Sequence, residues 1–185
     1  MRRFTAFAAA VLLATTTLTA CTTDNPGATT SSTPAGTTTT TANQPITVTD
    51  QTGRTVTLPK PAERIVGLTA SDIEIIYAVG AGAGVVGRGE YCDYPAEVLE
   101  VPIVQSGNDT NIEQIIALKP DIVFMSTMAQ TKEQVEKLEA AGIVVFATDA
   151  DTIAETYEAI TLVGKVLGKD AQAEAVVTQM KNQLT

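Results

Sequence analysis

From residue 64 onward, short apolar runs alternate with longer amphipathic stretches, and this alternation limits the folds open to the chain. The short runs are rich in Val and Ile, which predicts buried strands, whereas the longer stretches space their apolar residues as helices do. Strands that alternate with helices favour an α/β fold with a mostly parallel sheet covered on both faces. The predicted strands are 65–68, 85–87, 122–125 and 144–146, and the predicted helices are 72–79, 111–118, 132–141 and 153–167.

The predicted helices begin with a recurring local pattern. Each is preceded by Ser or Thr with Glu or Gln three residues later, the spacing of a capping box. In that motif the hydroxyl accepts from the backbone N–H of the third residue, whose side chain accepts from the backbone N–H of the cap residue. The four predicted pairs are Ser71 with Glu74, Thr110 with Glu113, Thr131 with Gln134, and Thr152 with Glu155.

Two further segments flank this alternating region. Residues 46–49 and 54–58 each alternate apolar and polar residues around a turn at 50–53, which predicts a small β-hairpin. Residues 170–185 have helical spacing without a closing Gly or Pro. We interpret this last segment as a helix cut by the end of the sequence, and therefore expect a fragment that lacks a second domain.

The N-terminus has the pattern of a lipoprotein signal peptide. Residues 1–20 contain two arginines followed by an apolar stretch that is short for a membrane span. The stretch ends in Leu18-Thr19-Ala20-Cys21, which resembles the bacterial lipobox, so Cys21 is the predicted lipidation site. Residues 21–45 are dominated by Thr and Ser and lack an apolar period; we expect them to form a disordered tether.

Composition excludes several functional classes. The chain contains no His, which removes His-dependent nucleophilic sites and His-ligated metals, and its net charge of −9 argues against nucleic-acid binding. The Gly-x-Gly-x-x-Gly pattern at 82–87 follows a predicted helix instead of a strand, so we interpret it as a helix-to-strand connection. Asp149 and Asp151 are interpreted as a helix entry, and Cys92 as a small loop residue. We expect no catalytic site, cofactor or metal site.

Several motifs together resemble the iron-siderophore and cobalamin class of substrate-binding proteins of ABC importers. The resemblance runs from about residue 46 to residue 185, in order and with the expected spacing. It rests on Gly53-Arg54 with Leu58-Pro59, Glu63-Arg64-Ile65-Val66 with Leu68, Glu74, Gly80-Ala81-Gly82 with Val85-Val86-Gly87, Tyr91-Cys92-Asp93-Tyr94-Pro95, Asn111-Ile112-Glu113 with Ala117-Leu118-Lys119-Pro120-Asp121, and Leu138 with Gly142-Ile143.

The resemblance implies a protein of two α/β sandwich lobes joined by one long helix. Residues 46–167 would then form the N-terminal lobe and 168–185 the start of the connecting helix, with the second lobe missing. It also implies a monomer, lipid-anchored through Cys21 on the outer face of the cell membrane, that delivers a metal chelate to an ABC permease and its ATPase. We expect a ferric siderophore first, with cobalamin or haem as alternatives. A structural or adhesion lipoprotein on the same fold remains the non-transport alternative.

Candidate ligand-binding residues follow from the predicted sheet. Ligands of open α/β sheets bind beyond the carboxyl ends of the strands. Arg88 could face an oxygen of an anionic chelate, and Tyr91 could contact the ligand. The resemblance assigns permease docking to Glu113, whereas the capping box gives the same residue a local role. The full candidate set in the strand-end loops is Thr69, Ser71, Arg88, Tyr91, Ser106, Asn108 and Ser126.

Overall fold

The computed structural model describes residues 45–126 and 131–184. The predicted signal peptide, Cys21 and all of the tether except its last residue lie outside these ranges. Among the described residues, none of the helices is both long enough and apolar enough to cross a membrane.

A five-stranded sheet lies at the centre, with every neighbouring pair of strands parallel. Its order is β5-β4-β3-β6-β7. The strands are β3 (Ile65–Gly67), β4 (Val85–Gly89), β5 (Ile103–Val104), β6 (Ile122–Ser126) and β7 (Val144–Thr148). The four predicted strands are therefore confirmed. The sequence did not reveal β5, because this edge strand is only two residues long.

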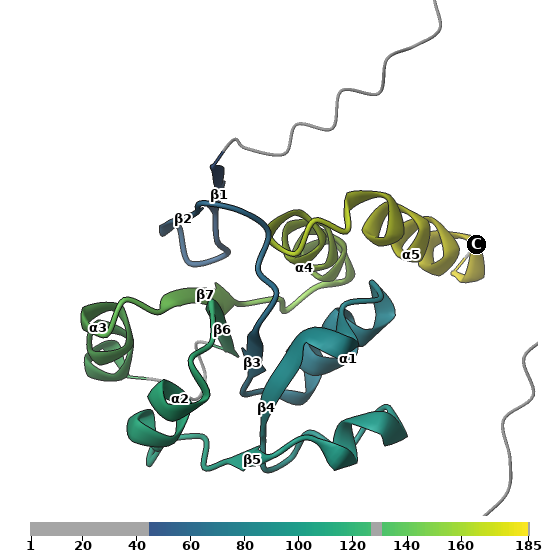
Figure 1. Cartoon of the computed structure of the whole chain (residues 1–185). Coiled ribbons are helices and arrows are strands. Elements are labelled where there is room, and N and C mark those ends of the chain that lie inside the picture. The colour runs from purple at the N-terminus through teal and green to yellow at the C-terminus, as the bar shows by residue number, and fades with distance from the viewer. Residues whose placement is uncertain (1–44, 127–130, 185) are drawn as a thin grey trace, which may run out of the picture. The chain divides into compact units, whose positions relative to one another are not determined.

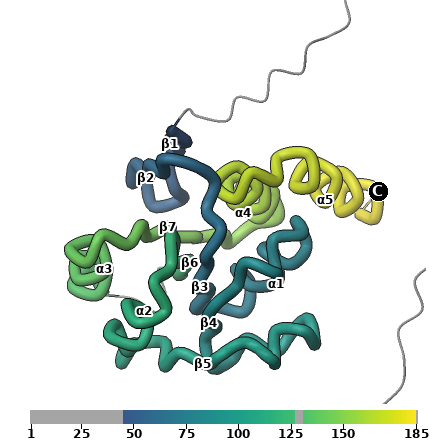
Figure 2. The backbone as a smooth tube through the Cα atoms, viewed as in Figure 1, coloured from purple at the N-terminus to yellow at the C-terminus, as the bar shows by residue number. Residues whose placement is uncertain are grey.

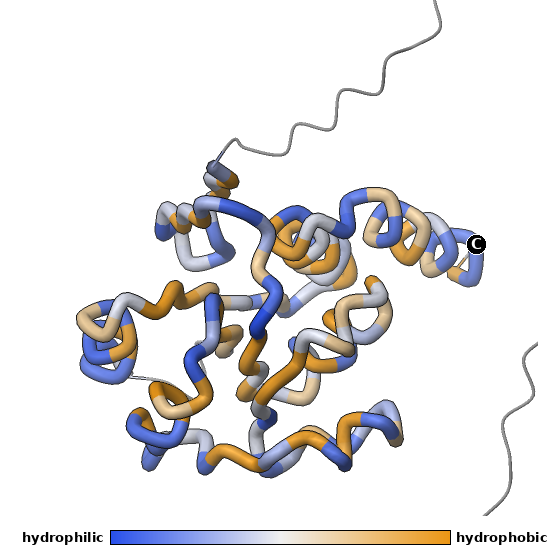
Figure 3. The backbone as a smooth tube through the Cα atoms, viewed as in Figure 1, coloured by the Kyte–Doolittle hydropathy of each residue, from blue (hydrophilic) through white to orange (hydrophobic). Residues whose placement is uncertain are grey.

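Successive residues of each strand face opposite layers of the molecule. Ile122 and Phe124 belong to one hydrophobic cluster and Val123 and Met125 to another, as a pleated strand buried on both faces requires. Figure 3 shows hydrophobic residues along the central strands. The first face is covered by α1 (Ala70–Ala78) and α4 (Ile153–Val166), and the second by α2 (Ile112–Leu118) and α3 (Lys132–Ala140), as Figure 1 shows.

Two predicted capping boxes are present and two are wrong. Thr131 with Gln134 begins α3, and Thr152 with Glu155 begins α4, each with both reciprocal hydrogen bonds. At α2 the cap is Asn111, whose side chain accepts from the backbone of Gln114, while the Thr110 hydroxyl donates to the carbonyl of Gly107. At α1 the cap position is Thr69, and its hydroxyl donates to the Asp72 carboxylate. Ser71 is therefore a residue of α1 and not its cap, and Glu113 is the second residue of α2 and not the third residue of a capping box.

The predicted hairpin is confirmed as β1 (Ile46–Thr49) and β2 (Thr55–Leu58), which pair antiparallel. It lies beside β7 and α4 (Figure 2). Val48, Val56 and Leu58 are buried in the hydrophobic cluster that α1 and α4 share. The hairpin is thus an integral part of the core.

The glycine pattern connects α1 to β4 through the short 3₁₀ helix η1 (Gly82–Gly84). A Cβ atom at Gly82 would lie 2.5 Å from the ring of Tyr77, so a side chain has no room there. The predicted helix-to-strand connection is confirmed. A second 3₁₀ helix, η2 (Ala96–Glu100), precedes β5 and was not predicted.

The last described helix is α5 (Asp170–Gln183), which packs along α4. Ala173 is buried in the hydrophobic cluster that α1 and α4 share. Val176, Val177 and Met180 are half-buried and pack against the same cluster. The approach is close: a Cβ atom at Gly164 of α4 would lie 2.4 Å from the Cβ atom of Ala173.

Candidate functional site

A pocket of about 440 Å³ lies at the carboxyl ends of β3, β6 and β7. Its volume is within the range of small-molecule sites. Three of the predicted ligand-binding residues, Thr69, Ser71 and Ser126, line it. The other lining residues are Ala70, Asp72, Ile75, Thr148, Asp149, Ala150, Asp151, Thr156 and Ala159.

Asp72 forms part of the pocket wall and is fully buried. One carboxylate oxygen accepts from the Thr69 hydroxyl, and the other accepts from the Thr148 hydroxyl at 2.8 Å. Burial raises the pKa of Asp72 to about 6, because desolvation disfavours the charged form more than these two hydrogen bonds favour it. The sequence pattern did not identify Asp72 as a candidate site residue. The available signal for such a role was its position in the first turn of α1.

The loop between β7 and α4 forms another wall of the pocket. The Glu155 carboxylate accepts from the backbone N–H groups of Asp151 and Thr152, at 3.0 and 2.8 Å. The hydrogen bond from the Thr152 hydroxyl, together with these two backbone bonds, lowers the pKa of Glu155. The predicted helix entry at 149–151 is confirmed, and no group of three His, Cys, Asp or Glu among the described residues is placed to hold a metal ion.

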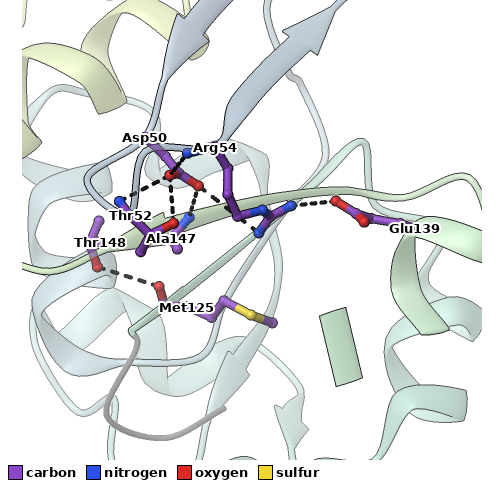
Figure 4. A network of polar contacts seen from close by, with 7 residues as sticks. All are labelled: Asp50, Thr52, Arg54, Met125, Glu139, Ala147 and Thr148. Atoms are coloured by element: carbon purple, nitrogen blue, oxygen red, sulfur yellow. Dashed lines mark hydrogen bonds and ion pairs between the residues drawn. The ribbon is translucent and has the colours of Figure 1, made fainter. Parts of the chain in front are cut away.

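The turn of the hairpin contacts β7 next to this pocket (Figure 4). The Asp50 side chain is fully buried and accepts from the backbone N–H groups of Thr52 and Arg54, and at 3.3 Å from that of Ala147. Arg54 also pairs with Glu139 of α3. A second hollow of about 440 Å³ lies between this network and α3, and Ser126 lines both pockets.

Arg88 lies inside β4, not in the strand-end loop that the sequence predicts, and it does not present a cation to the surface. The residue is buried; its guanidinium donates to the carbonyl of Cys92 at 2.9 Å and to that of Val101 at 3.2 Å. Both carbonyls belong to the segment between β4 and β5, outside the strand ladder. Arg88 thus ties β4 to that segment, and it does not line the pocket.

Tyr91, in the same segment, is 82 % exposed but does not line the pocket. Its neighbour Cys92 is buried, and burial raises the pKa of the thiol to about 11, so the thiol stays protonated near neutral pH. The interpretation of Cys92 as a small loop residue agrees with this.

Ser106 and Asn108 lie in the loop before α2, outside the pocket lining. The side chain of Gln134 in α3 donates to the carbonyls of Gly107 and Asn108, at 3.2 and 3.0 Å, and so ties this loop to α3. Glu113 lies nearby in the first turn of α2 and is exposed. Because Asn111 is the cap, Glu113 has no part in a capping box.

Comparison with known proteins gives a consistent picture. The family model described as periplasmic binding protein matches residues 65–185. The uncharacterized ABC transporter substrate-binding lipoprotein YvrC of Bacillus subtilis is 37% identical over 143 residues, which cover 76% of this chain and 45% of YvrC. A vitamin B12-binding protein of Vibrio cholerae is 36% identical over 106 residues, which cover 56% of this chain and 38% of that protein.

Among solved structures, a periplasmic solute binding protein from Veillonella parvula superposes with a TM-score of 0.67 and 29% identity. The match covers 75% of this chain and 46% of that one. The chain thus spans less than half the length of each of these three relatives.

Proposed function

Because this chain belongs to the periplasmic binding protein family, we propose that it captures a metal chelate outside the cell and delivers it to an ABC permease and its ATPase. The observation that carries the proposal is the pocket at the carboxyl ends of β3, β6 and β7, where open α/β sheets bind their ligands. The names of the relatives, a substrate-binding lipoprotein and a vitamin B12-binding protein, support the same role. The role is binding, and it needs no catalytic step.

The proposed ligand is a ferric siderophore, with cobalamin or haem as alternatives in the same role. Among the residues that the structure describes, the pocket lining contains three carboxylates, those of Asp72, Asp149 and Asp151, together with several hydroxyl groups, but neither Lys nor Arg. A chelate that turned an anionic face to this lining would be repelled. The lining therefore favours chelates whose contacting face is neutral or positively charged.

The pocket of this chain is proposed to be one half of a ligand-binding cleft. The remaining length of the relatives leaves room for a second lobe, and α5 is proposed as the start of the helix that leads to it. Residues 1–185 alone should therefore bind ligand more weakly than the full-length protein, since half of the polar contacts would be missing.

Native mass spectrometry of the full-length protein tests the proposal. The protein is purified from cells grown with limiting iron and from cells grown with limiting cobalt, and the mass that travels with it identifies the chelate. A ferric siderophore in the first preparation supports the leading assignment. A corrinoid or haem would support transport with a different ligand. If the protein carried no chelate and bound none when ferric siderophores, cobalamin and haem were added, the transport role would be rejected.

A further inference from the structure

We propose that Gln51, in the turn of the β-hairpin, is a positioning residue that holds the wall of the pocket formed by residues 149–151. This inference rests on the proposed binding function of that pocket. The hairpin precedes the segment matched by the family model, which begins at residue 65. It nevertheless supplies the contact that fixes part of the candidate site.

The evidence is a two-sided contact made by a single side-chain amide. The Oε1 atom of Gln51 accepts from the backbone N–H of Asp149 at 3.0 Å, and its Nε2 atom donates to the backbone carbonyl of Glu155 at 2.9 Å. Asp149 begins the β7–α4 loop, and Glu155 lies in the first turn of α4. One side chain therefore bridges the first residue of this wall and the first turn of the helix that follows it.

The turn that carries Gln51 is itself fixed to the sheet. The adjacent Asp50 closes the turn by accepting from the backbone of Thr52 and Arg54, and it also accepts from the backbone of Ala147 in β7 (Figure 4). Two neighbouring turn residues thus contact β7 and the loop that follows it. A displacement of the turn would move the wall that carries Asp149 and Asp151.

Two substitutions in the full-length protein separate the two halves of this contact, and a third serves as their control. Gln51→Met keeps the length of the side chain but removes both the donor and the acceptor. Gln51→Glu keeps an acceptor for Asp149 and removes the donor to Glu155. Gln172→Met is the matched control, because Gln172 is an exposed residue of α5, a helix that contributes nothing to the lining of this pocket.

The first readout is hydrogen exchange of the Asp149 amide without ligand, which does not depend on the proposed function. Gln51→Met should speed this exchange about fivefold, the effect of losing one ordinary hydrogen bond, and Gln51→Glu should stay within about twofold of wild type. Unchanged exchange in Gln51→Met, or equal acceleration in both variants, would overturn the assignment.

The second readout is affinity for ferrioxamine B, cyanocobalamin and haem. For whichever probe the wild type binds, Gln51→Met should weaken binding about threefold to tenfold, while Gln172→Met leaves it unchanged. Faster exchange at Asp149 with undiminished affinity would overturn the positioning role. If the wild type bound none of the probes, the proposed function would fail, and the positioning role for ligand binding would fail with it. The exchange result would then show only that Gln51 holds the loop.

Discussion

The Asp72 carboxylate at the start of α1 accepts a hydrogen bond of 2.8 Å from the Thr148 hydroxyl at the end of β7. Strand β3, which precedes Asp72, and strand β7, which ends in Thr148, are separated in the sheet by β6. The Thr148 hydroxyl also lies 3.5 Å from the carbonyl of Met125 in β6. The Thr148 hydroxyl therefore connects β7 with β6 and with Asp72, which follows β3, in the wall of the candidate pocket. The Asp72 carboxylate in this contact is not exposed to solvent.

The stability of the protein should depend on the ionisation of Asp72. Its pKa is raised from 3.8 to about 6, so the folded state binds the proton more tightly than the unfolded state. The stabilising contribution is complete below about pH 4 and is lost as pH rises through 6. A rise of this size corresponds to about 3 kcal/mol. Asp72→Asn cannot ionise at this position. The free energy of unfolding of this variant, minus that of the wild type, should therefore be more positive at pH 7.5 than at pH 4.5.

Urea unfolding at the two pH values measures this difference. Asp93→Asn serves as the control, because Asp93 is exposed in the β4–η2 segment and should give the same change in unfolding free energy at both. If Asp72→Asn also gave the same change at both pH values, Asp72 would titrate alike in the folded and unfolded chains.

The strands and helices could be predicted because their signals are local. Apolar runs located β3, β4, β6 and β7, alternation of apolar and polar residues located the hairpin, and two of the capping boxes located helix starts. Contacts between distant residues could not be predicted in the same way. Asp72 and Thr148 are 76 residues apart, and Gln51 and Asp149 are 98 apart. The burial of Arg88 could not be predicted for the same reason, since only the folded chain brings its guanidinium to the carbonyls of Cys92 and Val101.

Close packing between α4 and α5 should make Gly164→Ala destabilising. The added Cβ atom would lie 2.4 Å from the Cβ atom of Ala173 and 3.2 Å from the carbonyl of Lys169, so α5 would have to shift. Overpacking of this kind costs about 1–3 kcal/mol. Ala173→Gly removes the nearer atom, so the double variant should lose less stability than the sum of the two single variants. Thermal unfolding of all four proteins gives the coupling, and additive losses would contradict this packing.

The acidic lining of the pocket should favour positively charged chelates. Ferrioxamine B carries a protonated amine that its N-acetylated derivative lacks, so the two form a matched pair. The cationic form should bind the full-length protein roughly twofold to fivefold more tightly at low salt, because Asp149 and Asp151 are exposed and their charges are partly screened. The preference should shrink with added salt and also in Asp149→Asn/Asp151→Asn, which leaves only the buried carboxylate of Asp72 in the lining. Calorimetry measures both affinities; equal values at low salt would contradict the expectation.

Membrane attachment should depend on Cys21, which lies outside the described residues. A diacylglyceryl group supplies the two acyl chains that stable anchoring requires. Cys21→Ser should therefore release the full-length protein from the membrane fraction, whereas Cys92→Ser should leave it attached, because the Cys92 thiol is buried in the folded domain. Immunoblots of membrane and soluble fractions provide the measurement. Retention of Cys21→Ser in the membrane fraction would argue against a lipid anchor at this residue.

The role of Glu113 can now be tested without interference from helix capping. Since Asn111 caps α2 and Glu113 is exposed, Glu113→Gln should change the unfolding free energy by no more than about 0.5 kcal/mol. Its effect on transport should be large if the carboxylate docks into a basic site of the permease, because truncating one partner of a buried charge pair costs about 2–5 kcal/mol. Ligand affinity should not change, since Glu113 does not line the pocket.

The measurement is uptake of the bound chelate by cells that produce full-length Glu113→Gln, beside its thermal stability and ligand affinity. Glu158→Gln is the matched control, because Glu158 is an exposed glutamate of α4, which covers the opposite face of the sheet from α2. Slower uptake in Glu113→Gln alone, with stability and affinity preserved, supports docking through α2. Wild-type uptake would leave Glu113 as an ordinary surface residue in the first turn of its helix.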